Sequence, residues 1–166
     1  PFALVLALFC AALGRDAVED WIARTELPSL VPHTSVAVRD RDGILLRAYT
    51  VEDGRWRLNV APAQVDTRFL DMLIAYEDKR FYQHRGVDGW AVMRAAKQAL
   101  TSGKVVSGAS TLTMQVARLL EESGPGSWRG KVRQVRVAWA LEEVLTKDEI
   151  LNIYLRIAPF GGNMEG

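Results

Sequence analysis

The sequence contains very little cysteine and histidine. Its 166 residues include a single cysteine, Cys10, and two histidines, His33 and His84. One cysteine cannot form an internal disulfide, and so few thiol and imidazole groups cannot supply the ligands of a structural zinc site. Two classes of small protein are therefore excluded, those held together by disulfides and those built around zinc.

The sequence also lacks an excess of charge of either sign. It has 21 Lys and Arg against 20 Asp and Glu, which gives a formal net charge of +1. This balance provides no overall attraction for nucleic acid, so we expect no nucleic-acid partner. A hydrophobic content of 49% excludes a disordered charged tail. A chain of this length is expected to form one compact domain.

A long apolar run is missing as well. Residues 1–13 carry no charge, but a helix that spans a bilayer needs about 20 such residues. Because the sequence also begins without Met, we interpret residues 1–24 as a truncated membrane anchor with its linker helix. A signal-peptide core and a buried helix are the alternatives. The sequence stops in a loop at 161–166, and we expect more protein to follow it.

The rest of the chain has a short β-like part followed by helical spacing. Residues 35–60, with a turn at 40–43, predict a hairpin or a small three-stranded sheet. Asp88 and Gly103 are expected to bound one helix, Thr146 with Glu149 predicts a capping box, and 123–127 predicts a loop. The predicted fold is mostly α over 61–166, with helices at 66–79, 88–102, 110–122, 129–145 and 147–157.

One carboxylate falls on the apolar side of the helix predicted at 66–79. On a helical wheel Glu77 lies within the apolar arc, whereas Asp78 lies on the opposite side with Asp71 and Ala75. An apolar environment disfavours the charged form of a carboxylate, which suits a group that exchanges protons during a reaction. A glutamate satisfied by an arginine or by backbone donors is the structural alternative.

A dense run of charged and aromatic residues follows over 78–88. His84 in this run can bind a metal, but without partner histidines we expect it to make a hydrogen bond that fixes the loop. Lys79, Arg80 and Arg85 form either a solvated face or a rim that faces a phosphate.

A glycine-containing loop runs into the helix predicted at 110–122. Gly108 precedes Ser110, and free backbone N–H groups at such a helix start attract anions. Hydroxyl and amide donors on a polar stripe of this helix suit sugar or phosphate oxygens. A simple cap followed by a solvated face gives the same pattern. The stripe consists of Thr111, Gln115, Arg118 and Glu122.

The helix predicted at 129–145 has polar residues within its apolar arc. A lysine that points inward, as Lys131 does on the wheel, needs an anion from the protein or from a ligand. Gln134 lies in the same arc, and we interpret Glu142 as a structural partner. The opposite side is interpreted as a solvated or lipid-headgroup face; it carries Arg129, Arg133 and Arg136.

In these segments the sequence resembles glycosyltransferase family 51, the peptidoglycan polymerase module of class A penicillin-binding proteins. Four ordered blocks carry the likeness, and a fifth begins at Pro159 and is cut off. The stretches 129–134 and 158–163 are most similar to the penicillin-binding protein 1C subgroup. The four blocks are 77–88, 108–115, 129–131 and 146–155.

The resemblance implies a lysozyme-like, mostly helical fold that polymerises lipid II into glycan strands. The expected location is the outer face of the bacterial inner membrane, with a single-pass anchor and the catalytic domain in the periplasm. In the family, the glutamate that matches Glu77 is the general base. It deprotonates the 4-hydroxyl of the acceptor, which attacks C1 of the donor and expels undecaprenyl diphosphate with inversion.

The resemblance also assigns the residues around the base. Lys131 is the candidate cation for the diphosphate, and Ser110, Thr111 and Gln115 position the donor. Mg²⁺ or another divalent cation is the expected cofactor. The expected partners are lipid II, the growing glycan strand, the membrane and other cell-wall synthesis proteins. The residues that support the motifs are Asp78, Phe81, His84, Gly86, Asp88, Gly108, Gln134 and Lys147.

Two positions depart from the family pattern. Gln134 stands where the family usually has a second glutamate. An amide neither carries charge nor transfers a proton, which puts any metal-binding or electrostatic duty of that glutamate in doubt. Arg156 replaces the asparagine that commonly follows the Tyr-Leu pair, and the sequence suggests no mechanism for it.

Two other functions compete with this interpretation. A lysozyme or lytic transglycosylase shares the fold, but a retaining hydrolase needs a second carboxylate about 5–5.5 Å from the acid, and Asp88 is the nearby candidate. A non-catalytic scaffold that binds glycan is the other alternative, and the retained Glu77 and Lys131 argue against it. Because the fifth block is cut off, we also expect the cleft of this stretch to be open and the stretch alone to be inactive.

Overall fold

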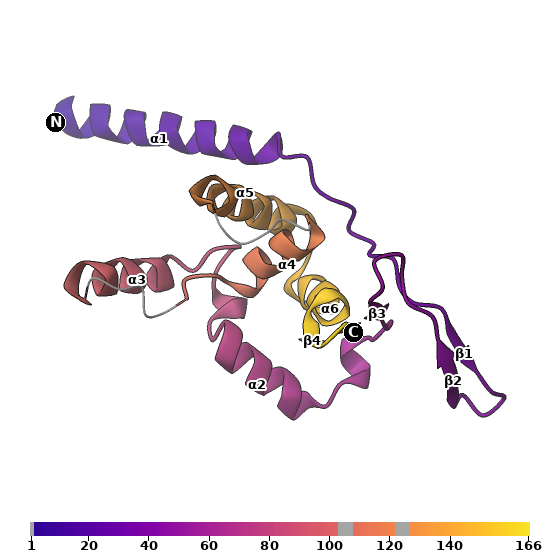
Figure 1. Cartoon of the computed structure of the whole chain (residues 1–166). Helices are drawn as coiled ribbons and strands as arrows, with labels where there is room; N and C mark the ends of the chain where they lie inside the picture. The colour runs from indigo at the N-terminus through magenta and orange to yellow at the C-terminus, as the bar shows by residue number, and fades with distance from the viewer. Residues whose placement is uncertain (1, 103–107, 122–126) are drawn as a thin grey trace.

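The computed structural model describes residues 2–102, 108–121 and 127–166, and more than half of them are helical (Figure 1). The mostly α fold that the sequence predicts is therefore confirmed. Each of the five helices predicted after residue 60 is present, with ends that differ by at most two residues from the prediction. The α-helices of the described ranges are α1 (Phe2–Ala23), α2 (Thr67–Glu77), α3 (Gly89–Ser102), α4 (Leu112–Leu120), α5 (Trp128–Val144) and α6 (Lys147–Ile157).

Side-chain caps explain where these helices begin. The side chains of Asp66, Thr111 and Ser127 accept hydrogen bonds from the first turns of α2, α4 and α5. The predicted capping box of α6 is confirmed, because Thr146 and Glu149 satisfy each other's backbone N–H groups. The predicted helix end at Gly103 and residues 123–126 of the predicted loop lie outside the described residues.

The strands form two small sheets. β1 (Ala37–Arg39) and β2 (Leu45–Ala48) make the predicted antiparallel hairpin. β3 (Trp56–Arg57) does not join them, so the alternative of a three-stranded sheet within 35–60 is wrong. Instead β3 pairs in parallel with β5 (Met164–Glu165), which also pairs with β4 (Pro159–Gly161).

Glu165 explains this pairing, because a buried carboxylate needs cationic partners. Its side chain is 3% exposed and accepts hydrogen bonds from Arg57 Nε at 2.6 Å and from Arg55 Nη1 at 2.7 Å. Both arginines come from the β3 segment. The ion pairs therefore attach β3 to the end of the described chain rather than to the hairpin.

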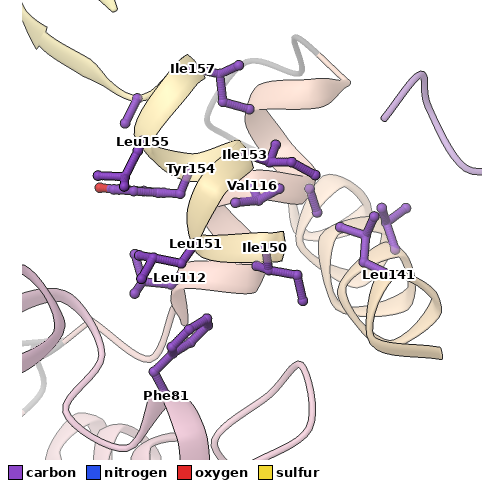
Figure 2. Packing of buried hydrophobic residues seen from close by; sticks show 13 residues of the cluster. Phe81, Leu112, Val116, Leu141, Ile150, Leu151, Ile153, Tyr154, Leu155 and Ile157 are labelled. Carbon is purple, nitrogen blue, oxygen red and sulfur yellow. The ribbon is translucent and has the colours of Figure 1, made fainter. Parts of the chain in front are cut away.

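The hydrophobic core lies between α4, α5 and α6 and extends to the loop after α2. Phe81, in the short helix η2 (Phe81–Gln83), is fully buried. Figure 2 shows its ring pointing toward the end of the cluster where Leu112 and Ile150 lie. A second short helix, η1 (Pro62–Gln64), precedes α2. The most deeply buried members of the core are Phe81, Leu112, Val116, Val137, Leu141, Ile150 and Leu155.

α1 extends away from this core and contacts it near its C-terminal end (Figure 1). Arg136 on α5 donates from Nε to Trp21 O at 2.9 Å, and its guanidinium lies over the Trp21 ring. Arg133 donates to Glu26 O at 3.0 Å. Two of the three arginines predicted to face solvent or lipid headgroups thus hold the end of α1 and the chain after it. Among the described helices, none combines the length and the apolarity that a membrane span requires.

Candidate active site

Glu77 and Asp78 lie at the C-terminal end of α2 in different surroundings, but not as the helical wheel predicted. α2 ends at Glu77, and Asp78 has a non-helical backbone with φ −159° and ψ 75°. The wheel therefore does not apply to Asp78, and its predicted place beside Asp71 and Ala75 is wrong. Asp78 is buried, with 7% exposure, whereas Glu77 is half-buried.

Asp78 connects three parts of the site. Its carboxylate receives His84 Nε2 at 2.9 Å and the backbone N–H of Leu112 at 3.0 Å. Leu112 is the first residue of α4, so Asp78 fixes the start of this helix against the end of α2. The prediction that His84 fixes the loop by a hydrogen bond is confirmed.

A second contact joins the same loop to α4. Thr111 Oγ1 donates to the carbonyl oxygen of Gly86 and accepts from the N–H of Met114. Gly86 has φ +67°, and a Cβ at this position would lie 2.9 Å from Ala138 O, so only glycine fits here. Thr111 is 2% exposed. It therefore holds the loop, and its predicted part in positioning the donor stays a prediction.

Asp88 and Arg80 form an ion pair next to these contacts. Arg80 Nε donates to Asp88 Oδ2 at 3.0 Å, and a second guanidinium nitrogen pairs with Oδ1. Asp88 also accepts from the N–H of Ala91 at 3.0 Å and so caps α3, as predicted. The hydrogen bond from Arg80 holds the pKa of the Asp88 carboxyl below its usual value, more than burial raises it.

Glu77 has one identified partner among the described residues. Gln115 Nε2, on α4, donates to Glu77 Oε2 at 2.8 Å. The structural alternative for Glu77 was a partner that is an arginine or a backbone donor. Its partner is instead the neutral side-chain amide of Gln115. An amide orients the carboxylate without neutralising its charge, and it leaves Oε1 available to accept a proton.

A cavity of about 280 Å³ opens beside Glu77. Its walls come from the end of α2, the start of α3 and the loop before α4, and it brings Glu77 together with Gly108, Ser110 and Thr111. Lys79 and Arg80 also line it, whereas Arg85 forms an ion pair with Glu143 at 2.9 Å. Arg85 lines a larger cavity of about 560 Å³ near the end of α1, which does not include Glu77.

Lys131 on α5 contacts Ser110, one of the residues that line this cavity. Its Nζ donates to Ser110 Oγ at 2.5 Å and to Gln134 Oε1 at 3.4 Å. Gln134 is buried as predicted, but Lys131 keeps much of its side chain exposed, so it points inward less than predicted. Partial burial of its ammonium and the positive charge of Arg118 both lower the pKa of Lys131.

Two further residues belong to the site. Burial and the charge of Glu77 together raise the pKa of Tyr154 to about 12, against the opposing charge of Arg118. Arg118 also influences Lys131, so α4 and α6 bring Arg118 and Tyr154 into electrostatic range of the base and the lysine. Arg118 could have been found in the sequence from its place on the polar stripe, three residues after Gln115. The sequence alone, however, assigned Arg118 no role.

The other motif residues have structural positions. Lys147 Nζ donates to Glu142 Oε1 at 2.7 Å and lies over the Phe81 ring, and Thr113 donates to the same carboxylate oxygen. Glu142 is therefore the structural partner that the sequence predicted.

Gly108 is exposed with open space around it. Arg156 donates to Val60 O at 3.4 Å, which ties α6 to the segment before α2.

The described residues contain no preformed cluster of metal ligands. Within these ranges no three His, Cys, Asp or Glu side chains come together in a way that could hold an ion, and Gln134 contributes a neutral oxygen where the family pattern has a carboxylate. Lys131, which contacts Ser110, is one cation near this cavity within the described ranges.

The arrangement can support one chemical operation, proton removal from a hydroxyl beside an anion-binding region. Glu77 is a carboxylate with one oxygen held by Gln115, and it lines a cavity shared with Ser110. Lys131 contacts Ser110. The base therefore lines the cavity and a cation contacts one of its lining residues, and a reaction with an alcohol nucleophile and an anionic leaving group needs both kinds of group.

Comparison with known proteins places this site in context. The family model described as transglycosylase matches residues 42–166. The chain is 46% identical over 159 residues to penicillin-binding protein 1C of Escherichia coli, which covers 96% of this chain and 20% of that protein. It is 36% identical to penicillin-binding protein 1A of E. coli, over 92% of this chain and 18% of that protein. The chain spans about a fifth of the length of these relatives.

Proposed function

The chain belongs to the transglycosylase family, and from this premise we propose that it is a peptidoglycan glycosyltransferase that polymerises lipid II into glycan strands. The observation that supports the proposal most directly is the position of Glu77. It is half-buried, held by Gln115 and open to a cavity, as a general base must be.

In the proposed reaction, Glu77 takes the proton from the 4-hydroxyl of the acceptor sugar. The hydroxyl oxygen forms a bond to C1 of the donor sugar, and the bond between C1 and the diphosphate oxygen breaks with inversion. The electron pair of that bond leaves with undecaprenyl diphosphate. A sugar hydroxyl is a poor nucleophile without a base, which is why the reaction needs Glu77.

The departing diphosphate gains negative charge that must be stabilised. We assign this role to Lys131 and Arg118, because Lys131 contacts Ser110 of the cavity that Glu77 lines, and the charge of Arg118 acts on both Lys131 and Tyr154. Ser110 orients Lys131 through their hydrogen bond. Thr111 acts indirectly, by holding the loop that carries Ser110. Mg²⁺ or another divalent cation stays a proposed cofactor, because Mg²⁺ binds through few protein carboxylates together with substrate phosphates, and no step is assigned to it.

The competing cleavage reaction finds less support. A retaining hydrolase needs a second free carboxylate close to the acid. Asp78 is bound to His84 and to the N–H of Leu112, and Asp88 is paired with Arg80. Both candidates for a nucleophile are therefore already engaged.

We also propose that residues 1–24 belong to an anchor that holds the catalytic domain at the outer face of the inner membrane, in the periplasm. The exposed apolar side chains of α1, such as Phe2, Leu4 and Leu8, support this location. Lipid II, the growing strand and other cell-wall synthesis proteins are the proposed partners. Membrane fractionation of the full-length protein tests the location, and recovery in the soluble fraction contradicts it.

Polymerisation of labelled lipid II by the full-length protein tests the function. We expect Glu77→Gln to reduce strand formation by at least about 100-fold, the range for loss of a general base, while Glu52→Gln, in an exposed loop, leaves it unchanged. Equal strand formation by Glu77→Gln and wild type would remove the proposed role. Release of soluble fragments from purified sacculi would favour cleavage, and binding of lipid II without turnover by the wild type would favour a scaffold.

A further inference from the structure

The larger cavity near the end of α1, of about 560 Å³, has no part in the proposed reaction. It is lined by the C-terminal end of α1, the segment that follows this helix and the end of α5. Its walls combine apolar and charged side chains, as a site for an amphiphilic molecule requires. The apolar ones include Ile22, Leu27 and Val144, and the charged ones are Glu19, Arg85 and Glu143.

Thr25 lines this cavity and has an unsatisfied polar atom. Its Oγ1 is shielded from solvent and has no hydrogen-bond partner among the described residues. A buried hydroxyl without a partner costs about 1–3 kcal/mol, and nearly all buried polar groups in native proteins are paired. The hydroxyl of Thr25 therefore points to a ligand with an acceptor oxygen in this cavity.

The charged groups of the cavity are of both signs and are held by exposed ion pairs. Arg85 pairs with Glu143 at 2.9 Å, and Glu19 pairs with Arg15 at 3.3 Å, with all four side chains more than half exposed. Such pairs contribute only about 0–1 kcal/mol, so a ligand can exchange with them. One guanidinium suits a phosphate, and two carboxylates suit an ammonium group. A ligand that carries a phosphate and a primary ammonium matches both signs.

The place of the cavity along α1 indicates where such a ligand comes from. Residues 2–13 of α1 carry no charge and are not buried against the domain, and we have assigned them to the membrane anchor. Glu19 lies about 9 Å beyond Leu13 along the helix axis, and the headgroup layer of a bilayer is about 5–8 Å thick. Trp21, a residue type that favours this interface, lies in the same turn as Glu19. The cavity therefore lies at the aqueous edge of the headgroup layer.

We propose that this cavity binds the headgroup of a phospholipid with a primary ammonium, of the phosphatidylethanolamine class. Arg85 binds the phosphate, and Glu19 and Glu143 bind the ammonium. Thr25 Oγ1 donates to an oxygen of the phosphate or the glycerol ester, and the start of an acyl chain packs on Leu27. The bilayer as the source of the ligand rests on the proposed anchor.

The same charges predict selectivity among phospholipids. Phosphatidylglycerol brings only negative charge to a cavity that has two carboxylates, which repel it. The quaternary ammonium of phosphatidylcholine has no N–H group, so it cannot donate hydrogen bonds to those carboxylates. Phosphatidylethanolamine satisfies the guanidinium and the carboxylates at once. We therefore expect it to bind in preference to the other two.

Native mass spectrometry of the full-length protein, released from micelles with equal amounts of these three phospholipids, tests the site. We expect the wild type to retain phosphatidylethanolamine in preference to the others. Thr25→Val should reduce its retention by about two- to tenfold, the range for one hydrogen bond. Arg85→Gln and Glu19→Gln should each reduce it by up to about fivefold, the range for exposed ion pairs.

Thermal unfolding in detergent provides a second measurement. Without phospholipid, Thr25→Val should be at least as stable as the wild type, because it removes a buried hydroxyl that has no partner. Added phosphatidylethanolamine should raise the melting temperature of the wild type more than that of Thr25→Val. The matched controls Thr50→Val, Arg24→Gln and Glu26→Gln change exposed residues outside the cavity and should match the wild type in both measurements.

Equal retention of the three phospholipids by the wild type overturns the proposal, as does unchanged retention of phosphatidylethanolamine in both Thr25→Val and Arg85→Gln. Retention is measured without lipid II, so a failure to polymerise rejects the proposed function and leaves the site intact. If the protein is recovered in the soluble fraction, the anchor fails, and binding of dihexanoyl phosphatidylethanolamine in solution then decides the site. Loss of that binding in Thr25→Val supports it, and equal binding overturns it.

Discussion

Gln115 Nε2 donates a hydrogen bond of 2.8 Å to Glu77 Oε2, which joins the last residue of α2 to the second turn of α4. The bond spans 38 positions of the sequence, so it exists only because α2 and α4 are brought together by the loop between them. Asp78 and His84 and the Thr111–Gly86 contact hold that loop. The orientation of the proposed base therefore depends on residues that do not touch substrate.

The first prediction concerns Gln115 itself. Gln115→Ala removes the donor that orients Glu77, and a hydrogen bond to a charged group contributes about 1.5–3 kcal/mol. We expect lipid II polymerisation to fall by roughly 10- to 100-fold, with little change in the melting temperature. Gln83→Ala, an exposed glutamine in η2, is the control. Activity equal to wild type in Gln115→Ala would show that Glu77 needs no such orientation.

The second prediction concerns Asp78. Asp78→Asn keeps the size of the side chain but turns one acceptor oxygen into a donor, which faces either His84 Nε2 or the N–H of Leu112. The site is buried, so we expect a loss of about 2–4 kcal/mol in the free energy of unfolding. Urea unfolding measures this. Asp71→Asn, on the exposed side of α2, should change stability little, and equal stability of the two variants contradicts the proposed network.

The third prediction compares two glycines with positive φ. Gly86→Ala forces φ +67° on an alanine whose Cβ lies 2.9 Å from Ala138 O, whereas Gly43, with φ +82°, has open space around it. We expect Gly86→Ala to lower the free energy of unfolding by about 2–4 kcal/mol and Gly43→Ala by about 1 kcal/mol. Thermal unfolding distinguishes them. If the two variants lose equal free energy of unfolding, the close contact between residue 86 and Ala138 on α5 relaxes at no cost in free energy.

The fourth prediction uses the pH dependence of the Arg80–Asp88 pair. The folded-state pKa of Asp88 lies below its ordinary value of 3.8, chiefly because of Arg80. The ionised form is therefore favoured by folding, so its contribution to stability is present above pH 3.8 and is lost as the pH falls through the lower folded pKa. We expect the difference in unfolding free energy between wild type and Asp88→Asn to shrink in acid. A difference that is constant with pH contradicts the assignment.

The fifth prediction concerns Lys131 and Arg118. Burial and the charge of Arg118 lower the pKa of Lys131, so its ammonium loses its proton at a lower pH than an ordinary lysine does. If Lys131 stabilises the diphosphate, kcat/KM for polymerisation declines when this proton is lost. Removal of the Arg118 charge in Arg118→Gln should shift the alkaline decline to higher pH while lowering the maximum rate. If kcat/KM of Arg118→Gln declines at the same pH as that of wild type, a group other than Lys131 causes the decline.

The control for the fifth prediction is Arg129→Gln, because Arg129 is exposed at the start of α5 and has no hydrogen bond or ion pair with another described residue. The alkaline decline of this variant should match that of wild type. A shift equal to that of Arg118→Gln would indicate a general effect of net charge rather than a local interaction with Lys131.

Much of the fold follows from local patterns. Apolar spacing predicted the five helices after residue 60, and short polar residues predicted caps at Asp88 and Thr146. These features depend on contacts three or four residues apart, which are visible in the sequence. Asp78 was misplaced because a helical wheel assumes that the helix continues, and α2 ends one residue earlier.

From the sequence came the proposal of which side chains carry the chemistry, since the resemblance of its ordered motifs to a known family points to Glu77, Gln115, Ser110 and Lys131. Tertiary structure decided how they are arranged: that Gln115 faces Glu77, that Arg118 and Tyr154 join the site, and that β3 pairs with β5 instead of with the hairpin. The physical reason is that these contacts join residues far apart in the chain. Their partners are selected by the packing of α4, α5 and α6 around a shared core and by buried charges that need counterions, neither of which a local pattern encodes.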